Sequence, residues 1–282
     1  MVNLAPDFTF SQSNLQDYLE CPRRFYLRYV RRLLWPNREM SSESENARRI
    51  LLGQTFHRLA QQKALGISNE KIQRLVANQP LEIQTWWENF QAWWENSLPA
   101  GLNGVRFAET SLTSGVAGSR LIAKYDLLVI HPSGTVTIYD WKTIAHPIKA
   151  ETLTRHVQSR VYPFIFMQAN ATLLPGRKIA PEQITMVYWF TADPDHPQQL
   201  PYHTRQYQAD QDYLTHLITE ILARQDEDFT LTTNEKYCAH CVYRTYCDRR
   251  ESDEGDETLI TDSDNPALLF PDDWDQVSEI AY

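Results

Sequence analysis

Between residues 105 and 141, three successive stretches in which apolar and polar residues alternate constrain the fold most strongly. A period of two residues is that of a β-strand with one buried face, and the sequence His-Pro-Ser-Gly at 131–134 has the composition of a tight turn. A helix over 149–171 and a buried strand over 184–191 follow. This order predicts a mixed β-sheet covered by helices, an α/β or α+β layered fold. The three strands are expected at Val105–Thr113, Leu121–Ile130 and Thr135–Trp141.

Helices are expected mainly before these strands. Ser13 and Gln16 have the spacing of a capping box, Pro22 suits the first turn of a helix, and Pro163 is expected to kink the helix over 149–171. The remaining elements are expected as helices at 14–20, 22–34, 47–64, 70–98 and 210–223 and as an edge strand at 200–207.

An aromatic stripe marks the helix expected over 70–98. Its members recur at helical spacing and therefore share one face; they are Trp86, Trp87, Phe90, Trp93 and Trp94. Such a stripe can stack the exposed bases of a nucleic acid. It is also typical of a helix that packs into a hydrophobic core, and this is the interpretation that we favour.

The charge is unevenly distributed along the 282 residues. The net charge is −9, but residues 251–282 hold 11 acidic residues and no Lys or Arg, which leaves 25 acidic and 27 basic residues elsewhere. The acidic balance is therefore compatible with a nucleic-acid partner. The acidic stretch predicts a disordered tail. Its acids could shield a basic DNA-binding face, or its apolar residues could dock on a partner; these are Leu268, Leu269, Phe270 and Trp274.

Targeting signals are not visible in the sequence. No stretch approaches the roughly 18 uninterrupted apolar residues of a membrane span. The first residues lack a basic segment followed by a long apolar one, as a secretory signal would have. We therefore expect a cytoplasmic protein without a membrane partner.

Two aspartates interrupt stretches that otherwise predict buried strands. Asp126 lies in the second strand, and Asp140 precedes Lys142 by two residues in the third, so Asp140 and Lys142 point to the same face. A buried carboxylate is costly unless it is paired or binds a cation. Two carboxylates can hold Mg²⁺ or Mn²⁺, which would activate water for phosphodiester hydrolysis with the lysine assisting. The alternative is a buried Asp–Lys ion pair that only holds the hairpin together.

The four cysteines also indicate a site. Cys238, Cys241 and Cys247 form the pattern C-x2-C-x5-C, and Cys21 precedes them by more than 200 residues. In a chain of this length, the pattern indicates metal or redox chemistry rather than a secreted disulfide scaffold. A site that joined all four would close nearly the whole domain and could hold zinc or an iron–sulfur cluster. The spacing alone does not distinguish the two.

Basic residues provide candidate contacts to DNA. The segment 21–38 contains six arginines and no acidic residue, and several of them fall on neighbouring helical positions. Such a stripe can follow a phosphate backbone, or it can be a solvated helix face with local ion pairs. A lysine beside the first aspartate could meet a further phosphate. The predicted contacts are Arg24, Arg28, Arg31, Arg32 and Lys124.

Taken in order, these features resemble the RecB-like branch of the PD-(D/E)XK nuclease superfamily. The resemblance runs through nearly the whole chain, and although each motif is weak alone, their order and spacing together are specific. The matching residues are Phe10, Ser13, Leu15, Tyr18, Cys21, Pro22, Phe25, Gly53, His57, Asp126, Asp140, Lys142, Gln158, Tyr162, Cys238, Cys241 and Cys247, and Glu109 also stands at a recurrent position.

The resemblance implies a restriction-endonuclease-like mixed sheet flanked by helices, with an N-terminal helical insertion. The implied boundaries are a nuclease domain at 1–250, with its helical part at about 11–100, its catalytic core at about 101–225 and its cysteine-rich loop at 236–250, and then the acidic tail at 251–282.

The resemblance also implies roles for individual residues. Lys142 resembles the catalytic lysine, and Gln158 and Tyr162 resemble a helix pair that positions DNA or supports the site. Two positions depart from the family pattern: Tyr125 replaces the proline before the first aspartate, and Ala123 replaces a frequent glycine, so its methyl group could crowd the backbone near the metal. The implied metal ligands are His57, Asp126, Asp140 and the carbonyl of Trp141.

The implied activity is hydrolysis of DNA, with single-stranded ends as substrate and Mg²⁺ or Mn²⁺ as cofactor, in DNA repair, recombination or CRISPR adaptation. The cysteine pattern resembles the iron–sulfur staple of AddB-type and CRISPR-adaptation nucleases, which favours a [4Fe-4S] cluster over zinc. No helicase P-loop occurs, so any unwinding would need a partner. The alternatives are an inactive DNA-binding or assembly subunit with the same fold, and a metal-bearing interaction module with no nucleic-acid role.

Overall fold

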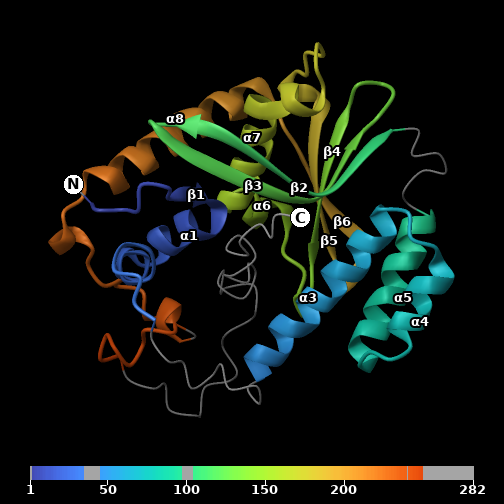
Figure 1. The fold of residues 1–282 in the computed structure, drawn as a ribbon, viewed down its shortest axis with the longest axis horizontal. Helices are drawn as coiled ribbons and strands as arrows, with labels where there is room; N and C mark the ends of the chain where they lie inside the picture. The colour runs from blue at the N-terminus through green and yellow to red at the C-terminus, as the bar shows by residue number, and fades with distance from the viewer. Residues whose placement is uncertain (1, 35–44, 97–103, 240, 250–282) are drawn as a thin grey trace.

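A six-stranded sheet stands between two groups of helices in the computed structural model, which describes residues 2–34, 45–96, 104–239 and 241–249 (Figure 1). Parallel and antiparallel strand pairs both occur, so the expected mixed sheet flanked by helices is confirmed. The tail expected over 251–282 lies outside the described residues. None of the described helices is long and apolar enough to cross a membrane.

The long strand β3 organises the sheet. It pairs along one edge with antiparallel β2, and along the other edge first with parallel β1 and then with antiparallel β4. Next to β4 lie parallel β5 and then antiparallel β6, which gives the order β1-β3-β4-β5-β6 with β2 beside β3. The strands are β1 (Thr9–Ser11), β2 (Val105–Val116), β3 (Ser119–Ile130), β4 (Val136–Lys142), β5 (Ile184–Phe190) and β6 (Asp193–Pro201).

The helices cover both faces of the sheet. In Figure 1, α1, α7 and α8 lie to one side and α3, α4 and α5 to the other. The longer helices are α1 (Gln12–Glu20), α3 (Glu45–Ala64), α4 (Asn69–Val76), α5 (Leu81–Asn96), α7 (Val157–Leu173) and α8 (Thr204–Ala223). The short ones are α2 (Pro22–Phe25), η1 (Tyr26–Val30), α6 (Ala150–Leu153), η3 (Pro181–Gln183), η4 (Asp226–Asp228) and η5 (Glu235–Cys238).

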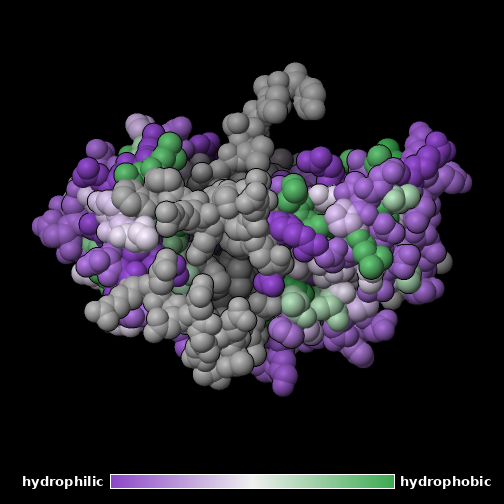
Figure 2. Space-filling model, turned by 90° about the horizontal axis from the view of Figure 1, so that it is seen from below, coloured by the Kyte–Doolittle hydropathy of each residue, from purple (hydrophilic) through white to green (hydrophobic). Residues whose placement is uncertain are grey.

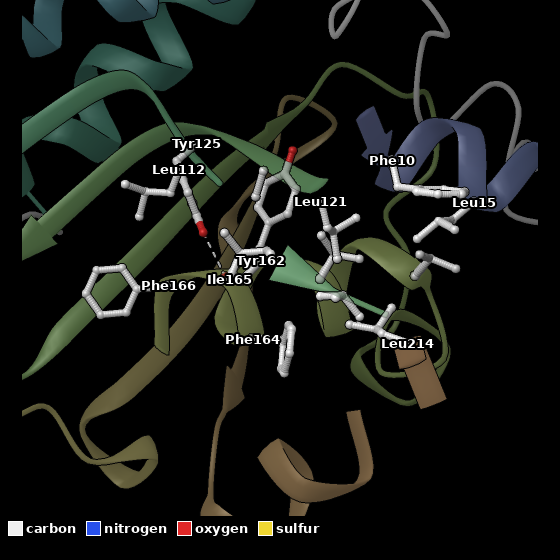
Figure 3. Packing of buried hydrophobic residues seen from close by; sticks show 14 of the residues in the cluster. Phe10, Leu15, Leu112, Leu121, Tyr125, Tyr162, Phe164, Ile165, Phe166 and Leu214 are labelled. Atoms are coloured by element: carbon white, nitrogen blue, oxygen red, sulfur yellow. Dashed lines mark hydrogen bonds between the residues drawn. The ribbon is translucent and has the colours of Figure 1, made fainter. Parts of the chain in front are cut away.

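Two hydrophobic cores hold these layers together. The first core lies between the sheet and the helices α1, α7 and α8 and includes Phe10, Tyr125 and Leu214 (Figure 3). The second core lies between the sheet and α3–α5. The face shown in Figure 2 is largely hydrophilic over its described part, with separate small hydrophobic patches.

The aromatic stripe of α5 belongs to the second core. Trp87, Phe90 and Trp93 are buried there, and Trp86 and Trp94 pack against them. Phe90 meets Trp141 of β4 edge to face, at 5.1 Å between ring centroids. The favoured interpretation as core is thus confirmed over base stacking.

The structure corrects the expected start of α1 and the expected end of the helix that begins at Pro22. The capping box of α1 is formed by Ser11 and Asn14, not by Ser13 and Gln16, since the Ser11 hydroxyl accepts from the Asn14 N–H and the Asn14 side chain accepts from the Ser11 N–H. The helix that begins at Pro22 does not reach residue 34. It widens into the π-helix η1 and ends there, with Arg32 in the left-handed region at φ 49°.

Proline and turn residues explain the other differences. The helix expected over 70–98 is two helices, α4 and α5, with Pro80 in the break, because proline lacks an N–H and restricts the residue before it. The expected helix over 149–171 is also divided, into α6 and α7, and α7 continues through Pro163. The edge strand expected at 200–207 is wrong in position, since β6 spans Asp193–Pro201. The chain beyond it is helical, because His203 accepts from the Gln206 N–H and starts α8.

Candidate active site

The β3–β4 pair opens at the two aspartates Asp126 and Asp140. Backbone pairing runs from Ile130 and Val136 to Leu127 and Tyr139 and is not continued beyond them. There, the Trp141 N–H donates to Asp126 Oδ2 at 2.7 Å. The side chain of Asp126 therefore occupies the place of a backbone acceptor, which fixes this carboxylate between the strands.

The β2–β3 pair is irregular at the same level. On β2, Leu112 belongs to the first core but Ala108 packs in the second, and on β3, Tyr125 belongs to the first core but Leu127 to the second. The two residues of each strand are separated by an even number of positions. In a regular strand such residues would share a face. The alternation therefore reverses near Glu109, which has a left-handed backbone at φ 49°. Backbone strain of this kind is uncommon outside glycine and is concentrated at functional sites.

The third member of this site comes from α3. His57 Nδ1 lies 3.1 Å from Asp126 Oδ1. The preceding Phe56 is fully buried and stacks on Trp189, which anchors this turn of the helix on the sheet. One turn earlier, a Cβ at Gly53 would lie 3.0 Å from Thr143 Oγ1, so glycine permits the close approach of α3 to the end of β4.

His57, Glu109 and Asp126 form a candidate metal site. Each offers one ligand atom, and the three atoms lie within 4.8 Å of one another. Among the described residues, no other group of three His, Cys, Asp or Glu side chains meets this condition. Carboxylate oxygens with one imidazole suit a divalent cation such as Mn²⁺. Glu109 was not among the predicted ligands, although its position, which recurs in the family that the sequence resembles, is a signal that could have identified it.

Asp140, Lys142 and Gln158 form a second, closed group beside the first. Lys142 Nζ lies 2.7 Å from Asp140 Oδ2 and donates to Gln158 Oε1 at 3.0 Å, and Gln158 Nε2 donates to Asp140 Oδ1 at 2.6 Å. All three side chains are buried. Asp140 thus does not join the three ligand atoms of the candidate metal site. It nevertheless lies close enough to raise the pKa of His57, and Asp126 in turn raises the pKa of Asp140.

Three buried acids of the site, Glu109, Asp126 and Asp140, have shifted pKa values. Burial raises the pKa of Asp140, and the nearby Asp126 charge adds to this rise against the opposing charge of Lys142. Burial and the Asp126 charge likewise raise the pKa of Glu109, against Lys124. Asp126 is also buried, yet His57 and the Trp141 N–H lower its pKa. A bound cation would relieve the repulsion among these carboxylates.

The His57–Asp126 pair predicts a pH effect on stability. Burial disfavours the charged imidazole, but Asp126, Glu109 and Asp140 outweigh it and raise the pKa of His57. The folded pKa is therefore above the unfolded value of about 6.5, so the stabilisation is complete below about pH 6.5 and is lost as the pH rises through the folded pKa. In EDTA, we expect wild type to lose more unfolding free energy than His57→Gln between about pH 6 and 9. Equal losses in urea unfolding would contradict this expectation.

Tyr162 and the two departures from the family pattern lie on the first-core side. The Tyr125 hydroxyl donates to the Tyr162 carbonyl at 2.9 Å, and the two rings are 5.1 Å apart (Figure 3). Tyr125 therefore joins the strand of Asp126 to α7, which carries Gln158. Ala123 is buried in the same core, so its methyl group packs against apolar side chains.

The four cysteines come from opposite ends of the chain, and their thiols lie within electrostatic reach of one another, although no three of their sulfur atoms lie within 4.8 Å of one another. Cys21 is buried before α2, and Cys238, Cys241 and Cys247 are half-buried. Burial, with the charges of Cys241 and Cys21, raises the pKa of Cys247 to about 11. Burial and Cys21 also raise the pKa of Cys238. Burial first, and the neighbouring thiols second, therefore disfavour ionisation of these cysteines. A bound metal would offset this, since metal ligation requires thiolates.

Contacts beside the cysteines join the same two segments. The Arg23 N–H donates to the Thr230 carbonyl at 3.0 Å. Phe229 stacks on Phe25 and Tyr26 at 6.1 and 5.2 Å between ring centroids. The docking of the C-terminal segment on α2 and η1 therefore has its own apolar and backbone contacts.

The structure divides the predicted DNA-contacting arginines. Arg24 is buried and pairs with Asp17 at 2.6 Å and with Glu20, and Arg28 pairs with Asp17 at 2.9 Å. Arg24 and Arg28 therefore form local ion pairs, the alternative to phosphate binding. Their partners Asp17 and Glu20 belong to α1, which precedes the segment without acidic residues. Arg31 and Arg32 are exposed.

Comparison with known proteins places these features in a wider group. A sequence model of the PD-(D/E)XK nuclease superfamily matches residues 9–248. No curated protein sequence matches the chain significantly. A crystal structure from Eubacterium rectale, with a provisional exonuclease assignment, superposes with a TM-score of 0.51 at 10% identity, over 80% of this chain and 85% of that chain. The structure of SSO0001 gives a TM-score of 0.41 at 14% identity, over 87% of this chain and 88% of that chain, which is too low to support an argument.

Proposed function

Because the chain belongs to the PD-(D/E)XK nuclease superfamily, we propose that it is a metal-dependent deoxyribonuclease that acts on single-stranded DNA ends. The observation that carries the proposal is the pair of adjoining groups at the opening of β3 and β4. One consists of the three candidate ligands His57, Glu109 and Asp126. The other fixes Lys142 within 2.7 Å of Asp140. A metal at such ligands can polarise a phosphodiester and activate water, and a lysine held beside it can stabilise negative charge on the phosphate.

Each residue has a role in this proposal. His57, Glu109 and Asp126 would hold Mg²⁺ or Mn²⁺. Asp140 and the Trp141 carbonyl would complete the ligand set once Asp140 turned from Lys142 and Gln158 toward the cation. When bound, the metal supplies a Lewis acid that polarises the phosphodiester and lowers the pKa of water. Gln158 orients Lys142, whose ammonium group stabilises negative charge on the phosphate. Tyr162 supports the site through its contacts with Tyr125.

A panel of labelled substrates tests this proposal. Linear single-stranded DNA, circular single-stranded DNA, duplex DNA and RNA are incubated with Mn²⁺ and with EDTA. The proposal expects metal-dependent shortening of the linear single strand, with the circle resistant, and the labelled end gives the polarity. Binding of DNA without cleavage of any substrate would instead support a non-catalytic assembly subunit.

The cellular setting is a further part of the proposal. A nuclease of this kind fits DNA repair, recombination or CRISPR adaptation. Because the sequence contains no P-loop, duplex substrates would have to be opened by a helicase partner. Arg31, Arg32 and Lys124 remain the proposed contacts to the DNA backbone.

We propose that the four cysteines hold a [4Fe-4S] cluster that ties the N-terminal helices to the C-terminal loop, with zinc as the alternative occupant. The four thiols from both ends of the chain lie close enough to affect one another's pKa values, which supports a shared ligand. A cluster bound by Cys21 and the three C-terminal cysteines would link the two ends of the domain, and a link that closes so long a loop is expected to stabilise the fold.

Replacing Cys21 by Ala tests the cluster. The variant loses one of four ligands, so we expect purified protein to lose iron and its melting temperature to fall. Iron and zinc are measured in protein prepared without oxygen, with thermal unfolding alongside. Wild-type metal content and melting temperature in Cys21→Ala would contradict the proposal, and zinc in place of iron would select the alternative.

A further inference from the structure

A lysine on β3 holds one of the candidate metal ligands. Lys124 Nζ lies 2.8 Å from Glu109 Oε2. Lys124 faces Ser111 across the β2–β3 pair, so the two partners are close neighbours in the sheet. Because Glu109 also belongs to the three-ligand group, the same carboxylate faces both a protein cation and the candidate metal position.

The two lysines of the site differ in how firmly they are held. The side chain of Lys142 is 8% exposed and is fixed by both Asp140 and Gln158. The side chain of Lys124 is 31% exposed, while that of Glu109 is 15% exposed. A long, partly solvated side chain loses little on leaving its partner, because its ammonium group can be hydrated again. Lys124 is therefore the cation of the site that can be displaced.

From this geometry, and resting on the proposed nuclease function, we infer that Lys124 is an internal counter-ion. It competes with the divalent metal for Glu109 and, once displaced, binds the phosphate backbone of DNA. Without metal, Lys124 balances part of the charge of Glu109 and Asp126. When a divalent cation takes that place, the ammonium group becomes available at the rim of the site, where the DNA backbone carries the complementary charge.

This exchange predicts two opposite effects of Lys124→Gln. Metal binding becomes tighter, by about two- to fivefold, because a partly exposed ion pair no longer has to be broken. Binding of single-stranded DNA to the metal-loaded protein becomes weaker, and the slope of its salt dependence falls by about one phosphate contact. A residue with only a structural role would move both affinities in the same direction or neither.

The experiment titrates the metal-free full-length chain with Mn²⁺ and follows binding by electron paramagnetic resonance. Oligo(dT) binding is then measured with Mn²⁺ in the Asp140→Asn background, where cleavage is blocked. Lys71→Gln on α4 is the matched control, since it removes an exposed lysine elsewhere. It should leave Mn²⁺ binding unchanged.

A second variant keeps the inference testable if Lys124→Gln folds poorly. In Lys124→Arg, the guanidinium group can pair with Glu109 through two parallel hydrogen bonds, so Mn²⁺ should bind more weakly than in wild type. Wild-type Mn²⁺ affinity in either folded Lys124 variant would overturn the inference and leave the proposed function intact. Absence of Mn²⁺ binding by wild type would instead remove the proposed function itself.

Discussion

Asp126→Asn is expected to lose Mn²⁺ binding and to reduce DNA cleavage by about a hundred- to a thousandfold or more, the scale of removing one key electrostatic group from a hydrolytic centre. Asp126 lies at the centre of the ligand group, since one oxygen meets His57 and the other accepts from Trp141. Asn has the same shape and can still accept the Trp141 N–H. The variant should therefore fold, while lacking the charge that holds a divalent cation.

The measurement combines Mn²⁺ titration with cleavage of labelled single-stranded DNA. Asp212→Asn on α8 makes the same chemical change at an exposed position and should behave as wild type in both. If Asp126→Asn retained wild-type Mn²⁺ affinity, the metal would have to bind elsewhere, and the assignment of this carboxylate would be wrong.

Lys142→Met is expected to destabilise the metal-free protein by about 3–5 kcal/mol, the usual cost of leaving one member of a buried ion pair alone. Asp140 and Lys142 are 4% and 6% exposed, so Asp140 would keep a buried charge without its cation. Burial already raises the pKa of Asp140, and loss of Lys142 removes an opposing charge. Asp140 can then take up a proton at low pH, so the destabilisation should be larger at pH 8 than at pH 5.

Asp140→Asn/Lys142→Met is the matched double variant. It removes both charges, so it should recover most of the lost unfolding free energy while remaining unable to cleave DNA. Urea unfolding in EDTA at both pH values measures these differences. If Lys142→Met had the same unfolding free energy as wild type, the charge of Lys142 would not be needed to stabilise the buried Asp140, and the ion pair described above would be contradicted.

The sheet and its two aspartates followed from local pattern. The alternation between residues 105 and 141 predicted β2, β3 and β4 to within a few residues, because a strand with one buried face repeats every two positions. Asp126 and Asp140 were recognisable because they interrupt apolar strands. The pairing of β1 with β3 was not predicted, since three residues are too few to give a period.

Features that depend on contacts between distant segments were harder to predict. Arg24 and Arg28 resembled a DNA-binding stripe because their acidic partners, Asp17 and Glu20, lie outside the segment that was considered. Glu109 joins the ligand group only because the backbone turns left-handed there. No local pattern specifies that conformation for a glutamate, since propensity disfavours it.

Cleavage of end-labelled single-stranded DNA by wild type and by Asp140→Ala, each with Mn²⁺ and with EDTA, tests the central claim most directly. The protein is prepared without oxygen so that any cluster is preserved. Products are expected only from wild type with Mn²⁺. Equal cleavage by Asp140→Ala would place the activity outside this site, and no cleavage by folded, Mn²⁺-binding wild type on any DNA would contradict the claim that the chain is a nuclease.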